Sequence, residues 1–201
     1  TACSPIMTVN INDGQMCHDN INFSQTYSLS ATASNAVSYI WMTDGTGTFG
    51  NAASLTTTYT PSASDVQDGQ VVLTITAKSG GACPDVKDQM ILTIWTPPTV
   101  NAPDAVTCAA SSYALTGVTA TNYSALAWTT SGTGTFNSAN TLNPTYFPSG
   151  ADLASGVVTL TITASKNPAS NSCSNASDVM RLTFLPAPTV NAGANTDICS
   201  A

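Results

Sequence analysis

One stretch of the sequence occurs twice, and its two copies constrain the fold more than any other feature. Residues 45–77 read GTGTFGNAASLTTTYTPSASDVQDGQVVLTITA, and residues 132–164 read GTGTFNSANTLNPTYFPSGADLASGVVTLTITA. The residues that the copies share, such as Gly45 and Gly132 or Pro61 and Pro148, are all 87 positions apart. Because chance does not hold one offset over such a length, the chain is a tandem duplication.

A proline-led opening strand marks where each repeat begins. Residues 5–12 read PIMTVNIN, residues 98–104 read PTVNAPD and residues 188–195 read PTVNAGAN. This motif predicts one repeat at 1–97, a second at 98–187, and at 188–201 the first strand of a truncated third repeat. The prolines stiffen each junction and leave no flexible linker. We therefore expect a linear array in which each repeat has the neighbouring repeats as partners.

Charge and cysteine usage exclude several classes of function. Four Lys and Arg against eleven acidic residues exclude an electrostatic nucleic-acid surface and argue against binding to anionic membranes. No run of about 18 apolar residues is present, so we expect no direct membrane insertion. Six cysteines without a CxxC pair favour disulfide bonds in an oxidising compartment over zinc. The sequence therefore predicts an extracellular protein displayed at the cell surface or released.

Short alternating strands within each repeat predict an all-β fold. An immunoglobulin domain pins its core with a Cys, a Trp and a second Cys at characteristic spacing. Apolar residues take those places here, and the Trp-to-Leu spacing is 32 residues in both copies. We expect tandem immunoglobulin-like Greek-key β-sandwiches, with a single helical turn near 62–66 that Ser62 and Asp65 cap. The predicted core residues are Leu29, Trp41, Leu73, Leu115, Trp128 and Leu160.

The sequence also carries a set of characteristic motifs: PTVNAGANTDIC, GTGTF, LxxTYxPSxxDxxxG, VTLTITA and a Cys before SDVMRLTF. Together they resemble the tandem Ig-like repeats of giant Bacteroidetes cell-surface adhesins, such as the SprB-type gliding-motility adhesins exported by the type IX system. The resemblance covers essentially the whole chain. It implies surface display and adhesion.

No catalytic constellation is evident. His18 is the only histidine, so no Ser-His-Asp or Cys-His site can be built in both copies, and we expect His18 to be solvated in a polar turn. No glycine motif follows a strand and opens a helix, which leaves phosphate binding unsupported. Tyr59, Tyr146 and Phe147 could form an aromatic platform for sugars, although packing on a β-surface is the favoured interpretation. The sequence predicts no enzyme and no cofactor.

Recurring aspartates are interpreted first as turn and cap residues, because Asp satisfies nearby backbone N–H groups. The alternative is calcium at a junction between domains, which needs several oxygens from adjacent loops. The calcium candidates are Asp65, Asp88, Asp152 and Asp178. Trp95 and its counterpart Leu185 precede the junction prolines, so we expect both at domain interfaces.

Two disulfide schemes fit the repeat, and strand geometry separates them. Cys83 and Cys173 are expected at the tip of the last hairpin, whereas Cys108 is expected near the opposite end of its domain. Because a disulfide needs Cα atoms within about 7 Å, we favour interdomain bonds, Cys17–Cys173 and Cys3–Cys83. The alternative is one bond inside each domain, Cys17–Cys83 and Cys108–Cys173.

Two functions remain open. The favoured one is a non-catalytic structural or adhesive segment of a long bacterial surface adhesin or filament, serving surface attachment or gliding motility. Its expected partners are neighbouring repeats, surface polysaccharides and solid surfaces. The alternative is an accessory carbohydrate-binding Ig-like module of a secreted polysaccharide-degrading enzyme.

Overall fold

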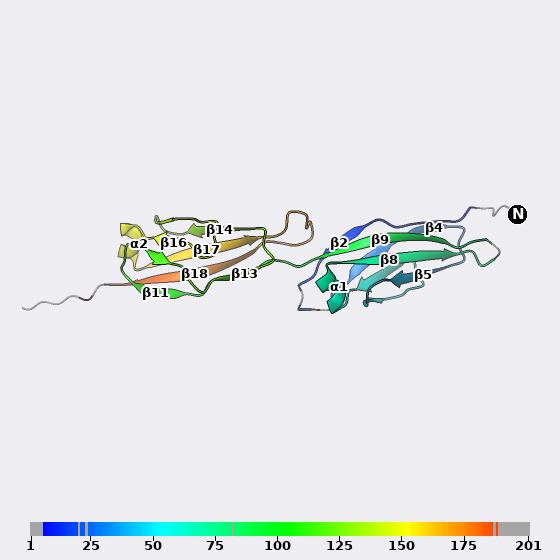
Figure 1. Cartoon of the computed structure of the whole chain (residues 1–201), viewed down its shortest axis with the longest axis horizontal. Coiled ribbons are helices and arrows are strands. Elements are labelled where there is room, and N and C mark those ends of the chain that lie inside the picture. The colour runs from blue at the N-terminus through cyan, green and yellow to red at the C-terminus, as the bar shows by residue number, and fades with distance from the viewer. Residues whose placement is uncertain (1–5, 20, 23, 82, 187, 189–201) are drawn as a thin grey trace, which may run out of the picture. The chain divides into compact units, whose positions relative to one another are not determined.

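A computed structural model of the chain describes residues 6–19, 21–22, 24–81, 83–186 and 188 (Figure 1). Nearly all regular structure is β, which confirms the predicted fold class. The chain divides into two compact units. The first unit comprises Thr1–Thr99, Thr121–Ala125 and Ala164–Ala176, and the second comprises Val100–Ala120, Leu126–Thr163 and Ser177–Ala201. The 164–176 segment of the second repeat thus clusters with the first repeat.

The described residues of the first repeat form three sheets. Their strand orders are β1-β4, β3-β7-β6 and β2-β9-β8-β5. The bounds are β1 Thr8–Asn10, β2 Gly14–Cys17, β3 Tyr27–Ser30, β4 Thr32–Ser34, β5 Ser38–Thr43, β6 Thr48–Phe49, β7 Thr56–Thr60, α1 Ala63–Asp68, β8 Gln70–Lys78 and β9 Val86–Trp95.

The second repeat has the same three sheets in the same order, namely β10-β13, β12-β16-β15 and β11-β18-β17-β14. The bounds are β10 Thr99–Asn101, β11 Ala105–Cys108, β12 Tyr113–Ala114, β13 Thr119–Thr121, β14 Ala125–Thr130, β15 Thr135–Phe136, β16 Thr145–Phe147, α2 Gly150–Ser155, β17 Val157–Ser165 and β18 Ala176–Leu185. Of the truncated third repeat, residues 189–201 lie outside the described part of the chain.

A short parallel pairing, which the sequence analysis did not predict, borders each four-stranded sheet. Strand β2 runs parallel to β9, from Gly14 opposite Leu92 to Cys17 opposite Trp95. Strand β11 pairs with β18 in the same way. These strands carry only one alternation of apolar residues, too little for a periodicity argument. They place Cys17 and Cys108 at equivalent corners of their sheets.

Apolar side chains of facing sheets fill each core. All six predicted core residues are buried: Leu29, Trp41, Leu73, Leu115, Trp128 and Leu160. Each indole also donates to a carbonyl, Trp41 Nε1 to Ser54 O at 2.8 Å and Trp128 Nε1 to Thr141 O at 3.2 Å. The indole N–H is thereby satisfied without access to water.

A hairpin centred between residues 82 and 83 would place Leu73 opposite Leu92, and this is the register behind the expected position of Cys83 at the tip; the observed β8–β9 register differs from it by two residues. Leu73 lies opposite Met90, and Leu92 lies opposite Val71. Two alternating apolar runs can pair in several registers that keep the same faces buried, so alternation alone does not choose among them. The register observed places the centre of the hairpin slightly before Cys83.

The predicted helical turn is a six-residue helix in both repeats. Ser62 caps α1 and Asp65 completes a capping box, which confirms the predicted cap; Ser149 and Asp152 repeat it on α2. Gly69 and Gly156 end the helices with φ of 74°. This left-handed conformation favours glycine, since a Cβ would crowd the backbone of its own residue, although the space around both positions is open.

Candidate functional site

A buried carboxylate joins four segments of the first repeat. Asp65 Oδ2 accepts from the Tyr59 hydroxyl at 2.8 Å and from the backbone N–H groups of Ser62 and Gly47, both at 3.0 Å. Asp65 Oδ1 accepts from Thr46 N–H at 3.0 Å. We call Asp65, Tyr59 and these donors the carboxylate clasp.

The second repeat builds the same clasp on Asp152. Its carboxylate accepts from the Tyr146 hydroxyl at 2.8 Å, Ser149 N–H at 2.9 Å and Thr133 N–H at 3.0 Å. Both carboxylates and both tyrosines are buried. A buried charge is tolerated only when hydrogen bonds replace its hydration, as they do here.

The duplicated GTGTF motif supplies the space that the clasp needs. A Cβ added at Gly45 would overlap the Asp65 carboxylate, and one at Gly47 would overlap the Tyr59 hydroxyl. Gly132 and Gly134 stand in the same relation to Asp152 and Tyr146. The phenylalanine of the motif contacts the buried tyrosine, with ring centroids 5.1 Å apart for Phe49–Tyr59. The motif is therefore required by packing.

The clasp shifts the pKa of its members in opposite directions. Burial alone would raise the pKa of Asp65, but hydrogen bonds from Ser62, Thr46 and Tyr59 outweigh burial and lower it. The pKa of Asp152 is lowered against the same opposing effect of burial. Burial raises the pKa of Tyr59 to about 12, and the neighbouring Asp65 carboxylate adds to the shift. The pair is an ionised carboxylate held by a neutral phenol across the neutral pH range.

The remaining calcium candidates also bond to backbone. Asp88 accepts from Ile11 N–H at 2.8 Å, and Asp178 accepts from Ala102 N–H at 2.8 Å. Asp13 and Asp104 accept from Ile91 N–H and Arg181 N–H. Within the described ranges, no three His, Cys, Asp or Glu side chains are grouped so as to hold a metal ion. Calcium binding stays a prediction, and no group of metal-ligating side chains among the described residues supports it.

The structure contradicts one expectation about side-chain exposure and confirms another. His18 is fully buried, where a solvated residue was expected. Its backbone N–H donates to the Trp95 carbonyl at 2.8 Å, which extends the β2–β9 ladder by one residue and holds His18 against the sheet. Tyr59 and Tyr146 are fully buried in the clasp, so of the three residues of the suggested platform only Phe147, at 43% exposure, could offer a ring to a sugar. The favoured packing interpretation therefore holds for both tyrosines.

A disulfide bond joins Cys17 of the first repeat to Cys173 of the second, with Cα atoms 5.1 Å apart. It is the interdomain bond that the sequence analysis favoured, and it excludes the alternative partners Cys83 for Cys17 and Cys108 for Cys173. Cys83 is also disulfide-bonded. Cys3, predicted as its partner, lies outside the described residues. Cys108 is an exposed free thiol.

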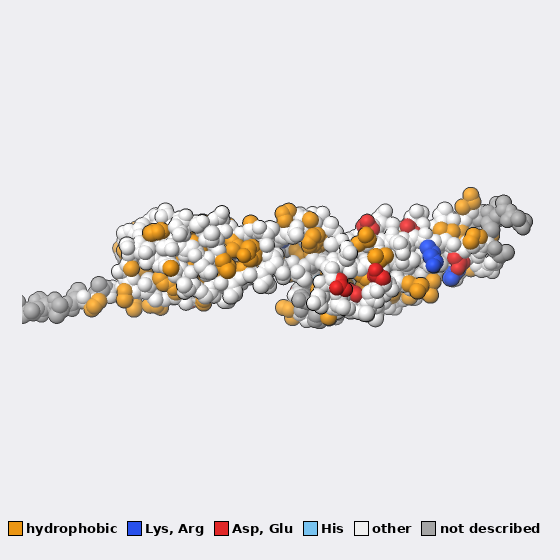
Figure 2. All heavy atoms as spheres, viewed as in Figure 1, with side chains coloured by type: hydrophobic (Ala, Val, Ile, Leu, Met, Phe, Trp, Pro, Cys, Tyr) orange, Lys and Arg blue, Asp and Glu red, His pale blue; other side chains and the backbone are white. Residues whose placement is uncertain are grey.

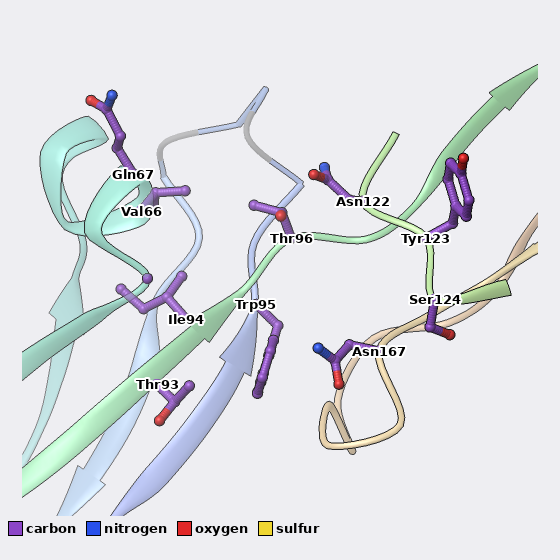
Figure 3. A pocket seen from close by; sticks show the side chains of 11 residues that line it. Val66, Gln67, Thr93, Ile94, Trp95, Thr96, Asn122, Tyr123, Ser124 and Asn167 are labelled. Carbon is purple, nitrogen blue, oxygen red and sulfur yellow. The ribbon is translucent and has the colours of Figure 1, made fainter. Parts of the chain in front are cut away.

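The first compact unit also contains an open hollow of about 480 Å³ (Figure 3). Trp95 lines it together with Val66 and Gln67 of α1, and with Asn122, Tyr123 and Asn167. The Trp95 indole N–H is buried without a hydrogen-bond partner among the described residues. The described residues that line the hollow include no charged side chain. Leu185, the counterpart of Trp95, is 48% exposed. The interface role of both residues stays a prediction.

Solved structures similar to this chain are tandem immunoglobulin-like and cadherin domains. An I-band fragment of titin, I67–I69, is 13% identical with a TM-score of 0.52, over 92% of this chain and 67% of that one. The fold is that of tandem immunoglobulin-like domains. At this identity the likeness shows the fold alone.

Two cadherin structures have lower TM-scores. Mouse cadherin-23 EC22-24 is 12% identical with a TM-score of 0.48, over 90% of this chain and 66% of that one. Protocadherin gammaB7 EC3-6 has the same identity and score, over 92% of this chain and 48% of that one. No protein-family model and no curated protein matches the sequence. Among the helices of the described residues, none is long and apolar enough to span a bilayer.

Proposed function

We propose that this chain is a non-catalytic structural and adhesive segment of a long bacterial cell-surface adhesin or filament, of the Bacteroidetes type that its motifs resemble. Its role would be surface attachment or gliding motility. The observation that carries the proposal is the Cys17–Cys173 bond, which covalently ties one sequence repeat to the next. A bond of that kind suits a protein that must transmit tension along its chain.

The chemistry of the buried groups supports a structural role. Catalysis by acid–base or nucleophilic groups needs titratable side chains poised beside a substrate. Here the buried groups with shifted pKa values, Asp65 and Tyr59 with their second-repeat copies, hydrogen-bond to one another, and the carboxylates also accept from backbone N–H groups. The surface carries few charges, as Figure 2 shows for the face in view. Such a surface suits weak contacts that gain strength from many copies.

An adhesion assay with controlled valency tests the proposal. The chain is displayed on beads at one or many copies per bead, over glass and polysaccharide-coated surfaces. We expect negligible retention at low copy number and retention under flow at high copy number, with no hydrolase, transferase or redox turnover. Beads carrying titin-type immunoglobulin domains at matched density are the control. Equal retention of both bead types would contradict an adhesive function.

The alternative, an accessory carbohydrate-binding module, is favoured by one observation. The hollow beside Trp95 combines aromatic rings with amide side chains, Gln67, Asn122 and Asn167, which is chemistry that suits sugar hydroxyls. Saturable micromolar binding of one defined glycan, abolished by Trp95→Ala and unaffected by Phe147→Ala, would favour this alternative over the adhesin.

A further inference from the structure

In the first compact unit, the loop of residues 166–175 packs on strand β2. We call this loop, which joins β17 to β18, the cysteine loop. Its Cys173 is bonded to Cys17 and is 6% exposed, and its Asn171 N–H donates to Gln15 Oε1 at 3.2 Å. The loop is braced internally, since Cys173 N–H donates to Ser170 Oγ at 3.2 Å and Ser170 N–H donates to Asn167 O at 3.0 Å. The loop is therefore hydrogen-bonded internally and meets one strand end.

The second repeat presents the same strand end in the same register. Val106 lies opposite Thr183 as Gln15 lies opposite Thr93, and Cys108 lies opposite Leu185 as Cys17 lies opposite Trp95. The next N–H bonds identically in both copies, Ala109 to Leu185 O and His18 to Trp95 O, each at 2.8 Å. The backbone that receives a cysteine loop in the first repeat is therefore repeated around Cys108.

This second strand end is apolar and uncovered. Val106 is 63% exposed, Leu185 is 48% exposed and Cys108 is an exposed free thiol. Val106 and Cys108 are two residues apart on one strand and Cys108 faces Leu185 across the ladder, so all three share one face of the sheet. We call Val106, Cys108 and Leu185 the acceptor surface. Its counterpart in the first repeat, formed by Gln15, Cys17 and Trp95, meets the cysteine loop.

We infer that the acceptor surface binds the cysteine loop of a further copy of this repeat, and that Cys108 then forms a disulfide with the cysteine of that loop. The inference rests on the proposed function, in which the chain is part of a repeat array, and it names the partner of the acceptor surface. Two thiols lose two protons and two electrons as the S–S bond forms. A protein disulfide oxidoreductase or oxidised glutathione accepts them and is itself reduced to two thiols.

An extended chain tests the inference. A second copy of residues 98–187 is placed directly after residue 187, in the register that the repeat motif sets. Non-reducing peptide mapping after oxidation with glutathione should find Cys108 joined to the Cys173 of the added copy. The Cys108 of the added copy should remain a free thiol, so that the count of free thiols does not rise. A Cys108 that stays free, or that is joined to another Cys108, would overturn the inference.

Two matched variants separate docking from chance oxidation. Val106→Asp places a charge on the acceptor surface and should slow formation of the new bond severalfold. Val179→Asp places the same charge on the same face of β18, further along the strand from Leu185, and should leave the rate unchanged. The Cys17–Cys173 peptide serves as the internal standard for folding in every variant. Loss of the Cys108 bond with that standard intact would leave the adhesive function standing and reject this inference alone.

Discussion

The carboxylates of Asp65 and Asp152 each accept hydrogen bonds from a helix cap, a glycine turn and a buried tyrosine. The sequence predicts the cap of the first repeat, because a Ser and an Asp three residues apart before an apolar residue are its local signature. The tyrosine lies 6 residues from the aspartate and the glycine turn 18–19 residues from it, so the local cap signature does not reveal that both bind the same carboxylate. Only the duplicated GTGTF and TY motifs hint at it, since both copies retain them.

The lowered pKa of Asp65 predicts a specific pH dependence of stability. An ionised carboxylate that the fold stabilises contributes fully above the unfolded value of about 3.9, and the contribution is lost as the pH falls through the lower folded value. Asp65→Asn should therefore cost roughly 1.5–3 kcal/mol at neutral pH, as expected for hydrogen bonds to a charged group. The variant should also lose less stability than the parent chain on acidification. Urea unfolding between about pH 6 and pH 2 measures both effects.

Two substitutions calibrate that experiment. Asp152→Asn removes the equivalent carboxylate of the second repeat, so this variant should also lose less stability than the parent chain on acidification. Asp68→Asn changes an exposed carboxylate at the end of α1 and should leave the pH dependence of stability unchanged. Parallel pH profiles for Asp65→Asn and the parent chain would show that the clasp does not hold its carboxylate ionised.

The core tryptophans carry the second residue-scale prediction. Trp41 and Trp128 are 3% and 4% exposed, so truncation to Ala removes a large buried ring and leaves a cavity. Each change should cost about 3–5 kcal/mol. Chemical denaturation of Trp41→Ala and Trp128→Ala measures the loss, and Tyr123→Ala, at 41% exposure, is the surface control. A loss below about 1 kcal/mol at either Trp would contradict its place in the core.

Among the elements, the cysteine loop depends most on a bond outside its own sequence. Its described links to β2 are the Cys17–Cys173 bond and the Asn171–Gln15 hydrogen bond. A single hydrogen bond contributes only about 0.5–1.5 kcal/mol. The disulfide therefore supplies most of what keeps this loop on the strand.

Removal of that bond should release the loop while the sheets persist. In the double variant Cys17→Ser, Cys173→Ser, the amides of Asn171 and Cys173 should exchange with solvent much faster, because local opening no longer meets a covalent restraint. Amides of β8 should keep their protection. Hydrogen exchange followed by mass spectrometry measures both, and Cys108→Ser, which removes the free thiol, is the matched control. Unchanged exchange at Asn171 in the double variant would show that noncovalent contacts suffice.

The elements that the sequence predicted well are those with long local signals. Alternation over β8, β9, β17 and β18 is unmistakable, and the Trp strands follow from spacing. Strands β2 and β11 were missed because four residues carry no period, and their parallel pairing depends on tertiary contacts. The burial of His18 was missed for the same reason: nothing near it in sequence shows that its N–H continues the β2–β9 ladder. The choice of disulfide partner was accessible, since it followed from which strand end each cysteine occupies.

For the whole molecule, the covalent path differs from the order of the chain. The bond between Cys17 and Cys173 spans a sequence separation of 156, so most of both repeats lies inside one covalent loop. A pull on the two ends of the chain is carried by the disulfide across that loop. The residues inside it are shielded from extension as long as the bond is intact.

Single-molecule stretching by the two ends should reveal this shielding directly. In the oxidised chain only residues outside the loop can extend, whereas after reduction the separation of 156 residues adds about 510–560 Å of contour length, at roughly 3.3–3.6 Å per residue. Without reductant, the double variant Cys17→Ser, Cys173→Ser should extend further than the oxidised parent but by less than the reduced chain, because the disulfide at Cys83 still closes a loop. Cys108→Ser should extend like the oxidised parent, because its thiol closes no loop among the described residues. Equal extension of the oxidised and reduced parent chains would show that the disulfide does not carry the load, and would remove the main support for a tension-bearing surface protein.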